Sequence, residues 1–109
     1  MANAKIIVMY PAPKDLDAFE RAYNEDHLPM VGPIFKSAGA TKGVFSKAVA
    51  APSGSPAFHR IAEIHFPSME TLQACVASQG GRDAVAHAHK ISSGGPPVVI
   101  VAEEETVML

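Results

Sequence analysis

The chain has 109 residues, the length of one domain, so we expect a single domain over residues 1–109. Its hydrophobic content of 48% is typical of a folded globular protein. A net charge of −2, without a cluster of Lys or Arg, argues against a nucleic-acid-binding surface. No apolar run approaches the roughly 20 residues of a membrane span, and the N-terminus lacks a signal-type segment. Cys75 alone cannot form an internal disulfide. We therefore expect a cytoplasmic protein that binds neither nucleic acid nor membrane.

Apolar runs and turn residues predict the secondary structure in chain order. A first strand spans residues 5–10, and a helix capped by Asp15 follows it. Pro29 disfavours helical geometry at the residue before it, so we expect the helix to break or restart near residues 26–29, with a second short helical piece over 29–36. Further strands are expected over residues 40–50, 58–66 and 98–102. Two more helices, capped by Ser68 and Ser78, are expected to end near residues 77 and 90.

The order of these elements is typical of the ferredoxin-like fold. The sequence therefore predicts an α+β protein, a four-stranded antiparallel sheet with helices on one face. The first and last strands are apolar on both faces, whereas a sheet covered on one side only should alternate polar and apolar residues. We expect a second copy of the chain to cover the other face, which predicts a homodimer through the sheet.

The most informative residues for function are Tyr23 and His27, four residues apart on the apolar face of the first helix. Two interpretations of His27 remain open. In the first, it is a core histidine with satisfied hydrogen bonds at the end of a helix. In the second, it is a general acid or base in an apolar pocket, since burial keeps an imidazole neutral and able to accept a proton.

The other four histidines give weaker indications. His87 and His89 border the apolar face of the last helix, whereas His59 and His65 are expected to share one face of the third strand. Two histidines that are two residues apart point to different sides of a helix. We therefore expect no metal site.

The other candidate residues and motifs indicate structural roles more than catalytic ones. Nucleotide-binding and nucleophile-elbow motifs are absent, so we expect no cofactor. Cys75 lies within an apolar helix, where a buried and inert thiol is the default. Arg60 and Glu63 on the third strand are interpreted as a structural or interface charge pair.

Several short motifs point to a known family. The chain contains Tyr10-Pro-x-Pro, Phe19, Tyr23, His27-x-Pro29, Arg60-Ile-Ala-Glu63 with Phe66, Ser78-x-x-Gly81 and Gly94-Gly95. In this order and spacing, over nearly the whole chain, the motifs resemble the EthD-type proteins. These proteins belong to the dimeric α+β barrel superfamily, in which ferredoxin-like subunits pair through their sheets.

The resemblance implies a pocket between the sheet and the helices of each subunit. Relatives in the superfamily include cofactor-independent quinol monooxygenases, muconolactone isomerases and polyketide cyclases. EthD-type proteins are also associated with degradation of ethyl tert-butyl ether, which implies a degradation pathway and oxidoreductase chemistry. The site residues that the resemblance implies are His27 and His87 for catalysis, and Tyr10, Tyr23, Phe66 and Ile91 for substrate binding.

The chain departs from the family pattern at His87, where the family commonly has an aspartate, and at Ile91, where it commonly has a phenylalanine. A His–Asp pair is thereby replaced by two imidazoles, one serving as base and the other as acid or oxyanion donor. The resulting hypothesis is a cofactor-independent enzyme that acts on a hydrophobic aromatic or lactone-type molecule by proton transfer or oxygenation. The alternative is a non-catalytic accessory or ligand-binding protein.

Overall fold

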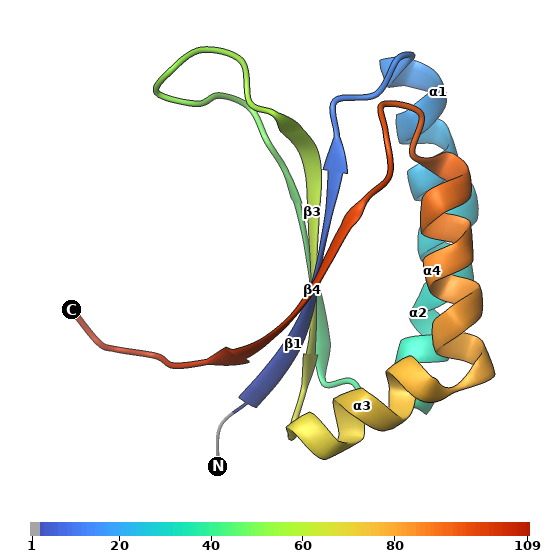
Figure 1. The fold of residues 1–109 in the computed structure, drawn as a ribbon, viewed down its shortest axis with the longest axis vertical. Helices are drawn as coiled ribbons and strands as arrows, with labels where there is room; N and C mark the ends of the chain where they lie inside the picture. Colours follow the sequence, from blue (N-terminus) through green and yellow to red (C-terminus); the bar gives the residue numbers. More distant parts are fainter. Residues whose placement is uncertain (1–2) are drawn as a thin grey trace.

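The computed structural model describes residues 3–109 and shows one antiparallel sheet with the helices gathered on a single face (Figure 1). The predicted α+β architecture is confirmed. The sheet has the strand order β2-β3-β1-β4, so β1 lies between β3 and β4. The strands are β1 (Asn3–Pro11), β2 (Lys42–Lys47), β3 (Phe58–Phe66) and β4 (Val98–Glu104).

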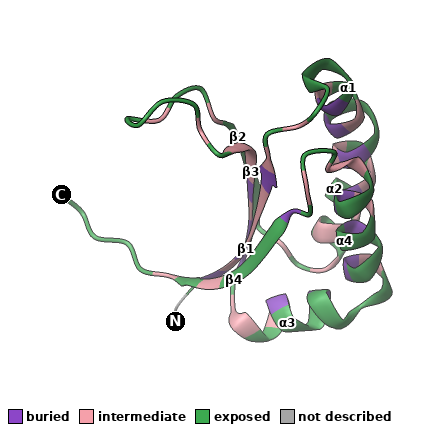
Figure 2. Ribbon diagram, turned by 45° about the horizontal axis from the view of Figure 1, so that its top comes forward, coloured by how far each residue is buried: buried purple, intermediate pink, exposed green. Residues whose placement is uncertain are grey.

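The register between β1 and β3 decides which side chains meet the helices. Ala4 lies opposite Phe66, and Ile6 lies opposite Ile64. These four side chains are buried against α3 (Met69–Ala77) and form one hydrophobic cluster with Leu72 and Cys75. Figure 2 shows the buried residues on the sides of the helices and strands that face one another. The predicted burial of the Cys75 thiol is confirmed, and burial raises its pKa.

The first helical region runs on from residue 16 to residue 37 without an interruption, so the chain does not break near residues 26–29. The predicted restart and second helical piece are confirmed, since a separate α-helical element spans residues 28–37. Asp15 caps α1 (Leu16–Arg21) as predicted, by accepting a hydrogen bond from the backbone N–H of Ala18. The chain then forms a π-helical turn, η1 (Ala22–His27), and continues directly into α2 (Leu28–Ser37). Pro29 falls in the first turn of α2, where the missing N–H of a proline is tolerated.

The second helical region follows the prediction closely. Ser68 caps α3 by accepting from the Thr71 N–H, and Ser78 caps α4 (Gln79–Ile91) by accepting from the Gly81 N–H. The interruption between α3 and α4 is confined to Ser78. Within residues 3–109, no helix has both the length and the apolar character that crossing a bilayer requires.

A β-bulge in β3 corrects the expected position of His59. Tyr10 pairs with Arg60, whereas the next residue of β1 pairs with Phe58, so His59 is the extra residue. His59 therefore turns toward the helices, where its Nε2 lies 3.0 Å from a carboxylate oxygen of Glu20, instead of sharing a face with His65.

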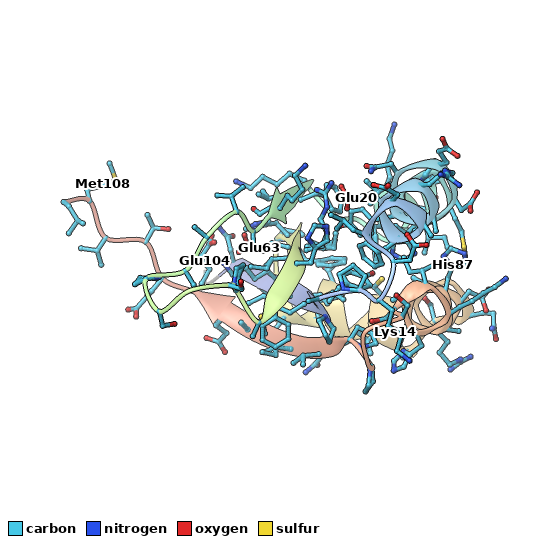
Figure 3. The ribbon with its side chains drawn as sticks, turned by 90° about the horizontal axis from the view of Figure 1, so that it is seen from above. Lys14, Glu20, Glu63, His87, Glu104 and Met108 are labelled. Carbon is cyan, nitrogen blue, oxygen red and sulfur yellow. The ribbon has the colours of Figure 1, made fainter. Side chains whose placement is uncertain are left out.

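Arg60 and Glu63 do not pair with each other, because they lie on opposite faces of the sheet. Arg60 donates two hydrogen bonds to Glu20 on the helical side. Glu63 accepts one from Lys5 on the other side, where Lys5 also reaches Glu104. Figure 3 shows Glu63 and Glu104 on the face away from the helices and Glu20 on the helical side.

Candidate functional site

Three side chains from three elements form a hydrogen-bonded row between the sheet and the helices. Tyr10 comes from β1, His27 from the end of η1 and His87 from α4. The Tyr10 hydroxyl lies 3.1 Å from His27 Nε2, and His27 Nδ1 lies 2.9 Å from His87 Nδ1. The two imidazole rings are nearly parallel, with 5° between their planes. In Figure 3, His87 lies on the side of α4 that faces the helix carrying His27.

The π-helical turn explains how His27 reaches this position. A turn closed by i→i+5 hydrogen bonds holds more than four residues, so residues four apart lie almost directly above one another. Here the Leu28 N–H donates to the Tyr23 carbonyl oxygen. Phe19, Tyr23 and His27 accordingly stack, with interplanar angles of 18° and 22°. Tyr10 meets all three rings edge-on, which fixes its hydroxyl against His27.

The buried part of the row, Tyr10 and His27, is electrically neutral at pH 7. Burial, and secondarily the charge that His87 carries when protonated, lower the pKa of His27 to about 4. Burial also raises the pKa of the Tyr10 phenol above its ordinary range, so Tyr10 keeps its proton. His27 is 6% exposed, whereas His87 is half-buried and links the row to the surface.

Both ring nitrogens of His27 are occupied by protein partners, which limits how it can act. Its Nε2 faces Tyr10 and its Nδ1 faces His87, so the polar atom of the row that remains available to a bound molecule is the Tyr10 oxygen. When Tyr10 gives its proton to a bound molecule, His27 can donate its Nε2 proton to the Tyr10 oxygen. His87 can then donate its Nδ1 proton to His27 Nδ1, and water can supply a new proton to His87 Nε2. Both imidazoles then end neutral in their other tautomer, so the row can carry one proton in either direction.

A cavity of about 100 Å³ lies between the sheet and the helices, beside this row. Tyr10, Tyr23 and His27 line it, as three of the six residues singled out from the sequence. Phe66 lies instead in the hydrophobic cluster with Leu72, and Ile91 packs beside the cluster of Tyr10, Phe19, Tyr23 and Ala88. His87 reaches the cavity only through His27.

Sequence reasoning missed most of the cavity wall, which is made of apolar side chains and one glycine. Alternation along the strands could have identified the sheet residues, but nothing in the sequence distinguishes a wall from ordinary core. The additional lining residues are Ile6, Val8, Val31, Phe35, Phe45, Ala62, Ile64, Cys75, Val76, Gly81, Ala84, Val85, Ala88, Val99 and Val101.

The Tyr23 hydroxyl is the unusual polar group of this cavity. Tyr23 is 0% exposed, and its oxygen has no hydrogen-bond partner within the described part of the chain. Burial is the main reason that the pKa of Tyr23 rises to about 12. The Arg60 guanidinium lies 5.0 Å from the centre of the Tyr23 ring, but it donates its hydrogen bonds to Glu20. These hydrogen bonds are the largest of the effects that lower the pKa of Glu20 to about 2.

Because this hydroxyl is buried and unsatisfied, Tyr23→Phe is expected to stabilise the ligand-free protein. An unpaired buried polar group costs about 1–3 kcal/mol, and the phenylalanine ring keeps the stack with Phe19 and His27. We expect the free energy of unfolding in urea to rise by about 1 kcal/mol. A loss of stability of that size would mean that the hydroxyl has a partner in solution.

The remaining histidines lie apart from the row. His89 is exposed, and its Nδ1 lies 3.0 Å from the Val85 carbonyl oxygen of its own helix. His65 lies on the outer face of the sheet, 3.8 Å from a Glu104 oxygen. Among residues 3–109, no three His, Cys, Asp or Glu side chains gather into a group that could hold a metal ion.

Comparison with known proteins agrees with this architecture. An uncharacterised 11.0 kDa protein of the thcB–thcC intergenic region of Rhodococcus erythropolis is 26% identical over 104 residues, 95% of this chain and 97% of its own. The crystal structure of an EthD family protein from Bacillus halodurans C-125 matches with a TM-score of 0.84 and 26% identity, covering 96% of this chain and 100% of that one. A dimeric ferredoxin-like protein of unknown function from Jannaschia sp. CCS1 shares the fold, with a TM-score of 0.72 and 14% identity over 94% of this chain and 99% of its own.

A family model supplies the assignment. The family model described as the EthD domain matches residues 12–93, which is well over half of the chain. The matched segment contains the helix with the stacked rings, the β-bulge at His59 and both helices of the second helical region. By this match, the chain belongs to the EthD family.

Proposed function

We propose that this protein is a homodimeric, cofactor-independent enzyme that moves a proton to or from a hydrophobic small molecule bound between the sheet and the helices. One observation carries the proposal: the row of Tyr10, His27 and His87 ends at an apolar cavity on one side and reaches the surface on the other. Tyr10 exchanges the proton with the substrate, and the two histidines connect Tyr10 to water.

The chemistry of the row favours proton transfer over simple ligand storage. A neutral imidazole can accept a proton on one nitrogen while it releases another proton from the opposite nitrogen, so His27 can pass a proton on without holding a positive charge in the apolar site. A substrate with an activated C–H or an acidic phenol can deliver its proton to the Tyr10 oxygen while Tyr10 passes its own proton to His27 Nε2. The substrate is left as an enolate or phenolate, and the proton leaves through His87. For an oxygenation, the same step would supply the electron-rich anion.

The alternative is a non-catalytic accessory protein that only holds a hydrophobic molecule. The unsatisfied Tyr23 hydroxyl and the apolar wall are equally consistent with storage. In that case His27 has only a structural role, through its hydrogen bonds with Tyr10 and His87.

Hydrogen–deuterium exchange separates the two functions. Neutral carbonyl compounds with acidic C–H bonds, acetophenone and 2-coumaranone, are incubated with the protein in D₂O, and loss of the C–H signal is followed by proton NMR. The enzyme is expected to accelerate exchange of at least one compound above the rate in buffer. Saturable binding of both compounds without faster exchange would favour the accessory protein.

The homodimer is supported by the face of the sheet opposite the helices. Ile7 lies opposite Ile100, and Met9 lies opposite Val98, so these apolar side chains share that face. Figure 1 shows that no helix of residues 3–109 covers it, and that the β2–β3 connection and the C-terminal segment project on this side. A second copy would bury this face, as the name of the dimeric Jannaschia protein suggests for its own fold.

A charge in the middle of this face should separate the copies. Sedimentation at micromolar concentration is expected to give twice the 11.5 kDa mass of one chain. Ile100→Lys is expected to give a monomer, because it would bury an unpaired ammonium between the sheets. A wild-type monomer at that concentration would contradict the dimer.

A further inference from the structure

The chemistry of the cavity wall selects among hydrophobic molecules. Around the cavity, as far as residues 3–109 form it, no Lys, Arg, Asp or Glu contributes to the lining. The lining residues that carry a polar side-chain group are Tyr10, Tyr23, His27 and Cys75. An ion would lose its water here without gaining a partner of opposite charge, which is strongly unfavourable.

The wall offers one hydrogen bond that the protein does not use. The Tyr10 hydroxyl is already bonded to His27, whereas the Tyr23 hydroxyl is buried and unpaired among the described residues. A buried hydroxyl without a partner is rare in folded proteins, and a bound molecule with an acceptor oxygen would satisfy it. Tyr23 and Tyr10 lie edge to face with their ring centres 5.4 Å apart, so an oxygen at Tyr23 stays close to the row.

Several exposed residues of the cavity wall are purely hydrocarbon. Val76, Val85, Val99 and Val101 come from α3, α4 and β4, and each is at least 40% exposed. These valines provide an apolar opening along the edge strand β4, where the body of a ligand can enter and remain.

We infer that the molecule bound here is uncharged, with a hydrocarbon body and one oxygen that accepts a hydrogen bond from the Tyr23 hydroxyl. The inference rests on the proposed function, since this molecule is the substrate whose proton Tyr10 moves. A ketone, lactone or ether oxygen meets the requirement, and a carboxylate does not.

Three probes of one shape test this selection. Ethylbenzene, acetophenone and benzoate share a phenyl ring and differ in carrying no oxygen, one neutral acceptor oxygen and a negative charge. Dissociation constants are measured at pH 7 by NMR titration of the backbone amide signals of the full chain, for the wild type and for Tyr23→Phe. Dividing the affinity for acetophenone by the affinity for ethylbenzene cancels the contribution of the hydrocarbon part that the two probes share.

Tyr23→Phe is expected to lower that ratio by about tenfold, the effect of one buried hydrogen bond, while ethylbenzene binds as before. Retained ethylbenzene binding shows that the cavity is intact in the variant. Benzoate is expected to bind at least about a hundredfold more weakly than acetophenone. Tyr10→Phe is measured alongside, because Tyr10 carries the other hydroxyl group among the lining residues, and the comparison tells which of the two tyrosines holds the oxygen.

Three results would overturn the inference. An unchanged ratio in Tyr23→Phe, or a ratio lost only in Tyr10→Phe, would remove Tyr23 as the oxygen-binding group. If benzoate bound more tightly than the other two probes, Arg60 would have released Glu20 and bound the carboxylate of benzoate instead. Failure of all three probes to bind at millimolar concentration would show that the cavity does not accept such molecules. Selective binding of acetophenone without deuterium exchange would contradict the proton transfer and leave the ligand class standing.

Discussion

His27→Gln is expected to lower the protein-catalysed deuterium exchange of a bound ketone or lactone by about 10²–10⁴-fold, the usual contribution of a positioned acid or base. Glutamine is close to histidine in size and can keep one hydrogen bond to Tyr10. Its amide cannot accept a proton and release it from the opposite side, so the row from Tyr10 to His87 is interrupted. The exchange rate measured by NMR at saturating substrate gives the size of the loss.

His89→Gln is the matched control for this substitution. His89 also lies on a helix, but it is exposed and contacts a carbonyl oxygen of its own helix. Its replacement should leave the exchange rate unchanged. If His27→Gln and His89→Gln both exchange at the wild-type rate, while both remain folded, then His27 serves structure and the proton follows another route.

The stability of the protein is expected to fall as the pH is lowered from 6.5 to 4. The pKa of His27 is about 4 in the folded protein, against an ordinary value of 6.5 for a solvated imidazole, so the unfolded chain takes up the proton first. The stabilisation is therefore complete above pH 6.5 and is lost as the pH approaches 4. A difference of this size corresponds to about 3 kcal/mol in the free energy of unfolding. Urea denaturation at half-unit pH steps would measure it.

A carboxylate also makes the stability depend on pH, but at lower pH than His27 does, so the two contributions can be measured separately. Glu20 has its pKa lowered from 4.5 to about 2, chiefly by its hydrogen bonds from Arg60, so its contribution is present above pH 4.5 and is lost below it. In His27→Gln the slope between pH 6.5 and 4.5 should disappear, whereas the loss below pH 4.5 should remain. An unchanged slope in His27→Gln would show that other groups cause the dependence.

Much of the fold could be predicted from local sequence. The caps at Asp15, Ser68 and Ser78 are local signals, because each side chain binds an N–H only three residues ahead. The strand over 58–66 was predicted with its observed bounds, because Pro56 and Pro67 limit it. Near Pro29 the helix changes type instead of breaking, because a proline disfavours but does not forbid helical geometry at the preceding residue. The predicted restart corresponds to the passage from η1 to α2 at residue 28.

The site was predictable only in part. Helical spacing brought Tyr23 and His27 to one face, but their contact with Tyr10 and His87 depends on how β1 and α4 pack against η1. The bulge at His59 and the unpaired hydroxyl of Tyr23 also arise from three-dimensional packing, which no spacing of residues reveals. The most important change concerns His27, whose two nitrogens both have protein partners, so the proposed function assigns the contact with the substrate to Tyr10.

The family pattern makes position 87 informative. An aspartate there would hold His27 by a charged partner and favour the imidazolium, whereas His87 adds no negative charge that would do so. Two neutral imidazoles can shuttle a proton by exchanging tautomers, without placing a charge in the apolar cavity. Under the proposed function, this chain would therefore move a proton differently from a protein with an aspartate at this position.

The neutral, buried state of His27 can be measured directly by following the ring nitrogens of ¹⁵N-labelled histidine by NMR from pH 8 to pH 3.5. The structure predicts that His27 remains neutral through pH 6.5 and takes up its proton only near pH 4, with Tyr10 and His87 as its partners. A His27 signal that titrates near pH 6.5, like a solvent-exposed imidazole, would contradict the buried row and the mechanism that rests on it.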